Sequence, residues 1–138
     1  MNQKRFQVRV AKVDTERRRI YGWASVVTKA GRMVRDRQGD VIPIEALEEA
    51  AVDYALSGGT LGLMHRATGV GRLIECCVFS KAKQHALGID LGFEGLWCGW
   101  QVDDEDVWRA YKRGELPSLS IGGVGHSMPY ERWVKEAR

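Results

Sequence analysis

About seven short runs of β-branched and aromatic residues, separated by turns, fill most of this 138-residue chain and limit the folds open to it. In the first run Phe6, Val8 and Val10 alternate with Gln7 and Arg9, which is the period of a strand with one buried face. The runs therefore predict a chain built mainly of strands. The expected strands span residues 5–13, 19–27, 60–65, 69–79, 85–93, 96–102 and 116–124.

Two further segments have the features of amphipathic helices. The first begins at Pro43, which suits a first helical position, and ends near Gly58. Its apolar face consists of Ile44, Leu47, Ala51 and Tyr54. The second covers residues 103–114, where Asp103 is the expected N-cap. The acidic run DDED (103–106) is interpreted as a capped helix start and not as a metal site, because acidic groups are favoured there without a cation.

The expected element order is β-β-α-β-β-β-β-α-β. This order predicts an α+β, mostly β fold, in which about seven antiparallel strands form a closed or half-closed barrel with surrounding helices. The length suits one domain over residues 1–138, and a hydrophobic content of 44% is enough for a core.

Charge and motif content exclude several classes of function. A net charge of +3 is too small to indicate nucleic-acid binding, and the basic cluster ERRRIYGW (16–23) is interpreted as a solvated turn. No membrane span or signal peptide is visible. The three cysteines suggest reduced thiols with a packing role in an intracellular protein. No phosphate-binding loop or zinc-ligand spacing is present, so no metal or cofactor is expected.

The candidate nucleophiles are Cys76, Cys77, Cys98 and the two serines of the stretch GELPSLSIGG (114–123). Ser118 and Ser120 share one face of the predicted strand, while Leu119 and Ile121 share the other face, which is expected to meet the core. The two glycines that follow could leave backbone N–H groups free for an oxyanion. The alternative is that both serines lie on the surface of an edge strand.

A serine hydroxyl needs a positioned base, and three histidines are candidates. His65 ends a predicted strand and shares the parity of the leucines two and four residues before it, which places it at the edge of a core. A purely structural role is the alternative for His65. His85 is expected to be exposed, and His126 follows the glycine-rich exit of the last strand.

Several segments, in this order along the chain, resemble the prohead (capsid maturation) proteases of tailed phages, and most closely the XkdF-like phage serine proteases. They are DRQGDVIPIEALEEAAVDYA (36–55), LMH (63–65), GVGRLIE (69–75), GLWCGWQVDDEDVWRAYKRGE (95–115) and LSIGG (119–123). The resemblance covers roughly residues 6–125. It implies the fold of the herpesvirus assemblin proteases, a barrel of antiparallel strands ringed by helices, as a single protease domain.

The resemblance also implies the roles of individual residues. In LSIG it makes Ser120 the nucleophile and leaves Ser118 as a residue that lines the site. In LMH it makes His65 the general base. The backbone near Gly122 and Gly123 is then the expected oxyanion site. The family uses no metal or cofactor.

The third catalytic residue is left open among three candidates. Glu75 is the first choice, because it faces His65 if the connection between their strands is centred on residue 70. A tight turn at residues 68–69 would instead bring Arg72 opposite His65. His126 is the second candidate and Asp40 the third, and Asp40 could equally order the loop before the first helix.

The function that the resemblance implies is a serine endopeptidase. It would cleave phage scaffold and capsid proteins, and also itself, during prohead maturation in the cytoplasm of the bacterial host. The expected partners are therefore capsid and scaffold proteins, with a homo-oligomer left open and no nucleic acid or membrane. The alternative is a non-catalytic capsid-assembly scaffold or interaction domain with the same fold.

Overall fold

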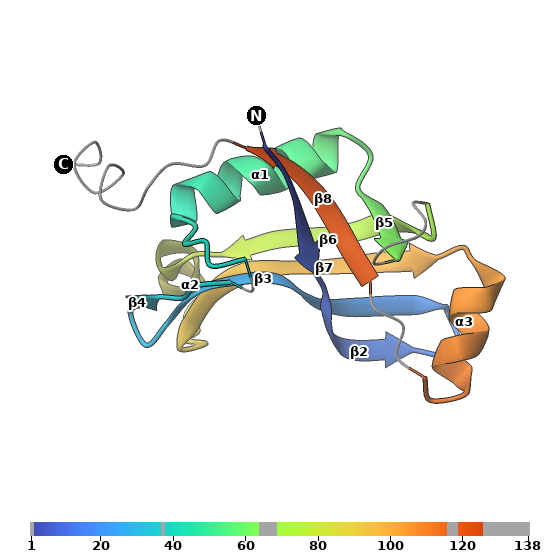
Figure 1. Cartoon of the computed structure of the whole chain (residues 1–138). Helices are drawn as coiled ribbons and strands as arrows, with labels where there is room; N and C mark the ends of the chain where they lie inside the picture. Colours follow the sequence, from blue (N-terminus) through green and yellow to red (C-terminus); the bar gives the residue numbers. More distant parts are fainter. Residues whose placement is uncertain (1, 37, 64–68, 116–118, 126–138) are drawn as a thin grey trace.

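The computed structural model describes residues 2–36, 38–63, 69–115 and 119–125, which form eight strands and three helices (Figure 1). The strands are β1 (Asn2–Gln7), β2 (Arg9–Asp14), β3 (Arg19–Lys29), β4 (Arg32–Met33), β5 (Thr60–Leu63), β6 (Gly71–Phe79), β7 (Phe93–Val102) and β8 (Leu119–Gly125). The helices are α1 (Ile44–Leu56), α2 (Lys81–Leu87) and α3 (Glu105–Lys112).

Seven of the strands pair in the order β1-β8-β5-β6-β7-β3-β2, every pair antiparallel, and the short β4 pairs with β3. β1 and β2 are two halves of one bent strand, interrupted at Val8. The Val8 N–H donates to the Leu119 carbonyl of β8 at 2.9 Å, whereas Arg9 pairs with Trp23 of β3. Because this strand joins both ends of the sheet, the sheet curls into a nearly closed barrel. The predicted fold class is confirmed.

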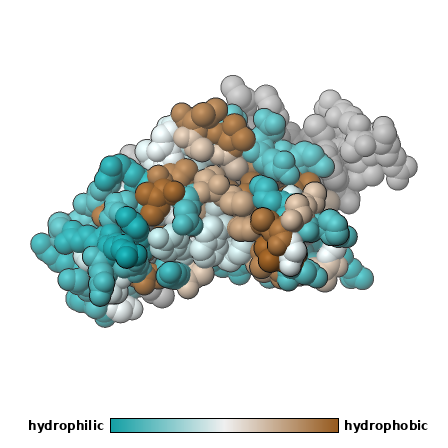
Figure 2. Space-filling view, turned by 180° about the vertical axis from the view of Figure 1, so that it is seen from behind, coloured by the Kyte–Doolittle hydropathy of each residue, from teal (hydrophilic) through white to brown (hydrophobic). Residues whose placement is uncertain are grey.

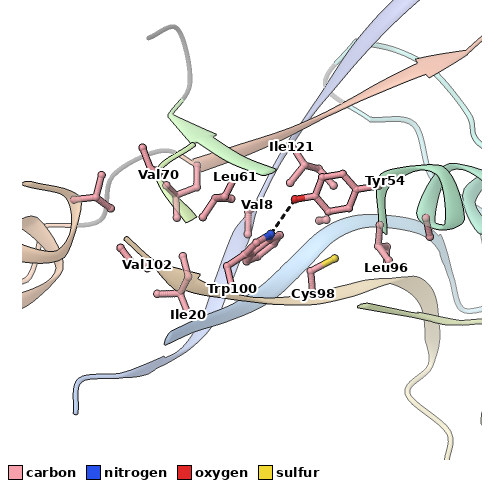
Figure 3. Packing of buried hydrophobic residues seen from close by; sticks show 14 of the residues in the cluster. Val8, Ile20, Tyr54, Leu61, Val70, Leu96, Cys98, Trp100, Val102 and Ile121 are labelled. Atoms are coloured by element: carbon pink, nitrogen blue, oxygen red, sulfur yellow. Dashed lines mark hydrogen bonds between the residues drawn. The ribbon is translucent and has the colours of Figure 1, made fainter. Parts of the chain in front are cut away.

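β5 lies between β8 and β6 but has only four residues, so it leaves part of the space between these two strands uncovered. Helix α1 covers the barrel interior on this side. It packs against β6, β7 and β8, and its buried residues are Leu47, Ala51 and Tyr54, three of the four predicted for its apolar face (Figure 1). Inside the barrel the Trp100 Nε1–H donates to the Tyr54 hydroxyl at 2.9 Å (Figure 3). That hydroxyl in turn donates to the Thr60 carbonyl at 2.8 Å. This chain of hydrogen bonds ties α1 to β5 and β7 within the core.

The prediction of a strand over residues 85–93 is wrong, because the chain forms the end of α2 and a loop there. Ser80 accepts a hydrogen bond from the Lys83 N–H and caps α2, and Gly88 ends this helix with a left-handed φ of 71°. The apolar residues that alternate from residue 87 to residue 91 are exposed, and β7 begins only at Phe93. Exposed apolar side chains of this kind form the brown areas that lie among hydrophilic teal in Figure 2.

Both predicted long helices are present, but their starts shift by one residue. Pro43 occupies the N-cap position of α1 instead of the first helical position. Asp104, and not Asp103, caps α3 by accepting from the backbone N–H groups of Asp106 and Val107. Asp103 instead forms a bidentate pair with Arg72. The acidic run therefore begins a capped helix, as predicted, but the cap is one residue later. Within the described residues no helix is long and apolar enough to cross a membrane.

Gly22 of β3 lies close to the backbone of β2, and we predict that Gly22→Ala destabilises the fold. A Cβ at this position would collide with the Arg9 carbonyl and lie 3.0 Å from the Val10 Cα, both backbone atoms that cannot turn away. Such overpacking costs about 1–3 kcal/mol. Thermal unfolding should therefore show a lower Tm than Gly31→Ala, where only the left-handed φ of 76° opposes the methyl group. A wild-type Tm for Gly22→Ala would contradict this packing.

Candidate active site

Ser120 lies on a central strand of the barrel and not on an edge. β8 runs between β1 and β5, and Ser120 pairs with Gln7 on one side and Gly62 on the other. Only 2% of Ser120 is exposed. The interpretation of Ser120 as a surface serine on an edge strand is therefore wrong. A central strand holds the serine backbone rigidly from both sides, which is what a positioned nucleophile needs.

The Ser120 side chain is on the opposite face of β8 from the core. Leu119 and Ile121 are 0% and 3% exposed and belong to the core cluster, which confirms the predicted parity. Because side chains alternate along a strand, Ser120 points to the outer face of the barrel. The Ser120 hydroxyl is nevertheless enclosed by the protein, which shields it from bulk water.

The backbone N–H groups of the two glycines predicted to bind an oxyanion, Gly122 and Gly123, point in opposite directions. The Leu119 carbonyl accepts from Val8 on the β1 side, and the β1–β8 register has no shift. Since backbone groups alternate in direction along an antiparallel strand, the N–H of Gly123 is also directed at β1. The N–H of Gly122 is directed to the opposite side, towards β5, but the pairing of β5 with β8 covers only Leu119 and Ser120 and does not reach Gly122. Of the two, Gly122 is thus the better placed donor.

Strand β5 brings the chain that leads to His65 alongside the serine. Gly62 pairs with Ser120, and Leu63 pairs with Leu119. His65 itself lies outside the described residues, as do Ser118 and His126.

Glu75 lies towards the other end of the sheet from Leu63. Thr60 pairs with Arg72, which is neither of the two registers considered from the sequence. At about 3.3 Å per residue, this register separates the level of Leu63 from that of Glu75 by roughly 15–20 Å along the strands. Glu75 is exposed, and its Oε1 accepts from the Trp97 indole N–H at 3.2 Å. Its role as the third catalytic residue stays a prediction.

Glu75→Gln separates a catalytic role from a structural one, because glutamine can still accept from Trp97. Loss of a third catalytic residue that orients the base costs up to about 10⁴-fold in kcat. From the register we expect instead that the variant cleaves substrate within about threefold of wild type, since distant surface substitutions leave such sites nearly unchanged. A loss of kcat far beyond that range, with unchanged Tm, would restore Glu75 as the third catalytic residue.

Asp40, the last of the three candidates, has backbone contacts that order a loop. Its N–H donates to the Asp36 carboxylate at 3.0 Å, and the Asp36 N–H donates to the Asp40 carbonyl at 2.9 Å. These reciprocal bonds shape the turn before α1 and match the loop-ordering alternative.

Of the three thiols, that of Cys98 belongs to the core cluster and that of Cys76 packs against it. Cys98 is fully buried and lies directly opposite Cys76 on the neighbouring strand. The hydrogen bond with Cys98 lowers the pKa of Cys76 to about 7, against the opposing effect of burial and with help from the Lys83 charge. Cys98 itself has a raised pKa because of the same hydrogen bond and its burial. Since Cys98 packs inside the barrel, a packing role fits it better than that of a nucleophile.

The barrel holds the Ser120 hydroxyl in a fixed position on a central strand, which is compatible with a serine hydrolase. Comparison with known proteins agrees with this class. The family model described as "Putative phage serine protease XkdF" matches residues 7–129. The chain therefore belongs to this family of phage serine proteases. No curated protein and no solved structure matches the chain.

Proposed function

We propose that the protein is a serine endopeptidase with Ser120 as nucleophile and His65 as general base. The observation that carries this proposal is the enclosed Ser120 hydroxyl on β8, paired directly with the strand that leads into the LMH segment. The family supports proteolysis in general. The proposal rests on this pair and needs no contribution from Glu75.

The proposed reaction follows the acyl-enzyme route. Ser120 Oγ attacks the carbonyl carbon of a peptide bond while His65 takes the hydroxyl proton. The carbonyl oxygen becomes an oxyanion, for which the Gly122 N–H is a donor. When the tetrahedral intermediate collapses, the C–N bond breaks and His65 gives its proton to the leaving amine. Water then attacks the acyl-enzyme with His65 again as base, which releases the new carboxyl group and regenerates Ser120.

Phage capsid and scaffold proteins are the proposed substrates, together with the protease chain itself, inside proheads assembling in the bacterial cytoplasm. This assignment agrees with the phage origin of the family. Co-expression with the phage's capsid and scaffold proteins tests it: the intact proteins should give rise to shorter fragments with defined new termini.

A matched pair of histidine variants makes the test specific. His65→Ala should abolish the fragments, because removing a member of the catalytic unit costs orders of magnitude in kcat. His85→Ala, at an exposed position of α2, should leave them unchanged. If both variants and wild type give no fragments, the non-catalytic assembly domain becomes the better description. If His65→Ala still produces the fragments, His65 is not the base.

A further inference from the structure

The residue opposite Ser120 on the β1 side carries a carboxamide, that of Gln7. Gln7 and Ser120 are direct partners in the β1–β8 register. Because Val8 and Leu119 form a hydrogen-bonded pair, the neighbouring Gln7–Ser120 pair is of the non-hydrogen-bonded kind, in which the two side chains approach most closely. On the other side of Ser120 the partner is Gly62, which has no side chain. The β5 partner of Ser120 therefore has no side chain, whereas its β1 partner carries an amide.

Gln7 also points to the same face as Ser120. Val8, the next residue, is 6% exposed and belongs to the core cluster, and Phe6 packs against that cluster from the same side of the strand. Alternation then directs Gln7 to the outer face, where the Ser120 hydroxyl lies. Gln7 is half-buried.

The ladder around Ser120 leaves few backbone donors for an oxyanion. The Ser120 N–H is directed at β5, where Ser120 pairs with Gly62. The Ile121 N–H is directed at β1, where Ile121 pairs with Phe6. Both N–H groups nearest the nucleophile therefore face partner strands. The reaction still requires donors that stabilise the developing negative charge, and a side-chain amide is an established kind of donor for this purpose.

We propose that the Gln7 Nε2–H₂ group is a catalytic hydrogen-bond donor that stabilises the oxyanion formed when Ser120 attacks a peptide carbonyl. This role rests on the proposed serine protease function. A carboxamide has two N–H donors and one acceptor, so Gln7 can keep a protein partner and still donate to the substrate. Gly122 supplies a second donor from the backbone.

A fluorophosphonate provides the direct test, because its phosphoryl oxygen occupies the oxyanion position when Ser120 attacks the phosphorus and fluoride leaves. Gln7→Met keeps the length of the side chain and removes its hydrogen bonds. We expect the second-order rate constant of inactivation to fall about 10²–10³-fold, as for loss of one oxyanion donor. The pH at which the rate is half-maximal should stay unchanged, because it reports the base and not the donor. Gln7→Glu, which cannot donate when ionised, should be at least as slow.

Gln101→Met is the matched control, because it makes the same change on the outer face of β7, a strand that is not adjacent to β8. The carboxamide that it removes accepts a hydrogen bond from Arg19. This variant should react with the fluorophosphonate at the wild-type rate. If Gln7→Met lowers the Tm, the rates are compared at a temperature where circular dichroism shows both proteins folded. Gln7→Met and Gln7→Glu reacting within about threefold of wild type would overturn the role of Gln7, since one donor is worth far more. Unchanged labelling and cleavage in Ser120→Ala would instead remove the proposed function itself.

Discussion

Ser120→Ala is expected to lower kcat/KM for cleavage of a capsid or scaffold substrate by at least about 10³-fold, because loss of the nucleophile removes the acyl-enzyme route entirely. The change deletes one oxygen atom from a side chain that is 2% exposed. Alanine fits the same strand position, so circular dichroism and Tm should remain close to those of the wild type. The kinetics of substrate loss, followed by gel densitometry or mass spectrometry, measure the effect.

Ser25→Ala serves as the control for this variant. Ser25 is a partly exposed serine on β3, on a strand that is not adjacent to β8, and its loss should leave kcat/KM unchanged. Ser120→Ala with full activity would show that another group attacks the peptide bond. Equal losses in both variants would indicate a general sensitivity of the barrel and not loss of a nucleophile.

Trp100→Ala is expected to cause the largest loss of stability, about 3–5 kcal/mol in the free energy of unfolding. Trp100 is 0% exposed at the centre of the barrel, where its ring contributes to the core between α1 and β7 (Figure 3). Alanine would leave a cavity and also remove the N–H that donates to the Tyr54 hydroxyl. For a domain of this size the loss corresponds to a fall in Tm of roughly 10–15 °C, which calorimetry or thermal circular dichroism measures.

Tyr54→Phe isolates the polar part of this effect. It removes the acceptor of the Trp100 indole N–H and the donor to the Thr60 carbonyl, and leaves the ring in place. Leaving buried polar groups unsatisfied costs about 1–3 kcal/mol. The free energy of unfolding should therefore fall less than in Trp100→Ala. A Trp100→Ala variant as stable as Tyr54→Phe would mean that the core does not pack around the indole.

Alternation along β8 was enough to predict which of its residues meet the core, because period two is a local property of the backbone. The acidic start of α3 was also predicted, because helix capping is likewise a local property of the sequence. The cap is Asp104, however, and Asp103 pairs with Arg72. Local alternation misled at residues 85–93. There an exposed loop happens to alternate apolar residues, and α2 has seven residues, too few to reveal a helical period.

Strand register could not be predicted from the sequence, and the candidate site depends on it. Alternation is equally satisfied by pairings shifted by two residues, so it did not decide which residue stands opposite Thr60. The pairing of β6 with β7 also has a register shift between Leu73 and Glu75, which alternation does not predict. Gln7 could be assigned to an outer face from parity alone. Its position beside Ser120 required the pairing of β1 with β8, two strands from opposite ends of the chain.

The nucleophile itself is tested most directly by mapping a fluorophosphonate adduct. The folded protein is treated with the reagent, digested and analysed by tandem mass spectrometry, with His65→Ala and urea-unfolded protein as parallel samples. The proposed function predicts one adduct on Ser120 in the folded wild type, and none in His65→Ala or in the unfolded chain. An adduct on Ser118 or on another residue, with Ser120 unmodified, would contradict it.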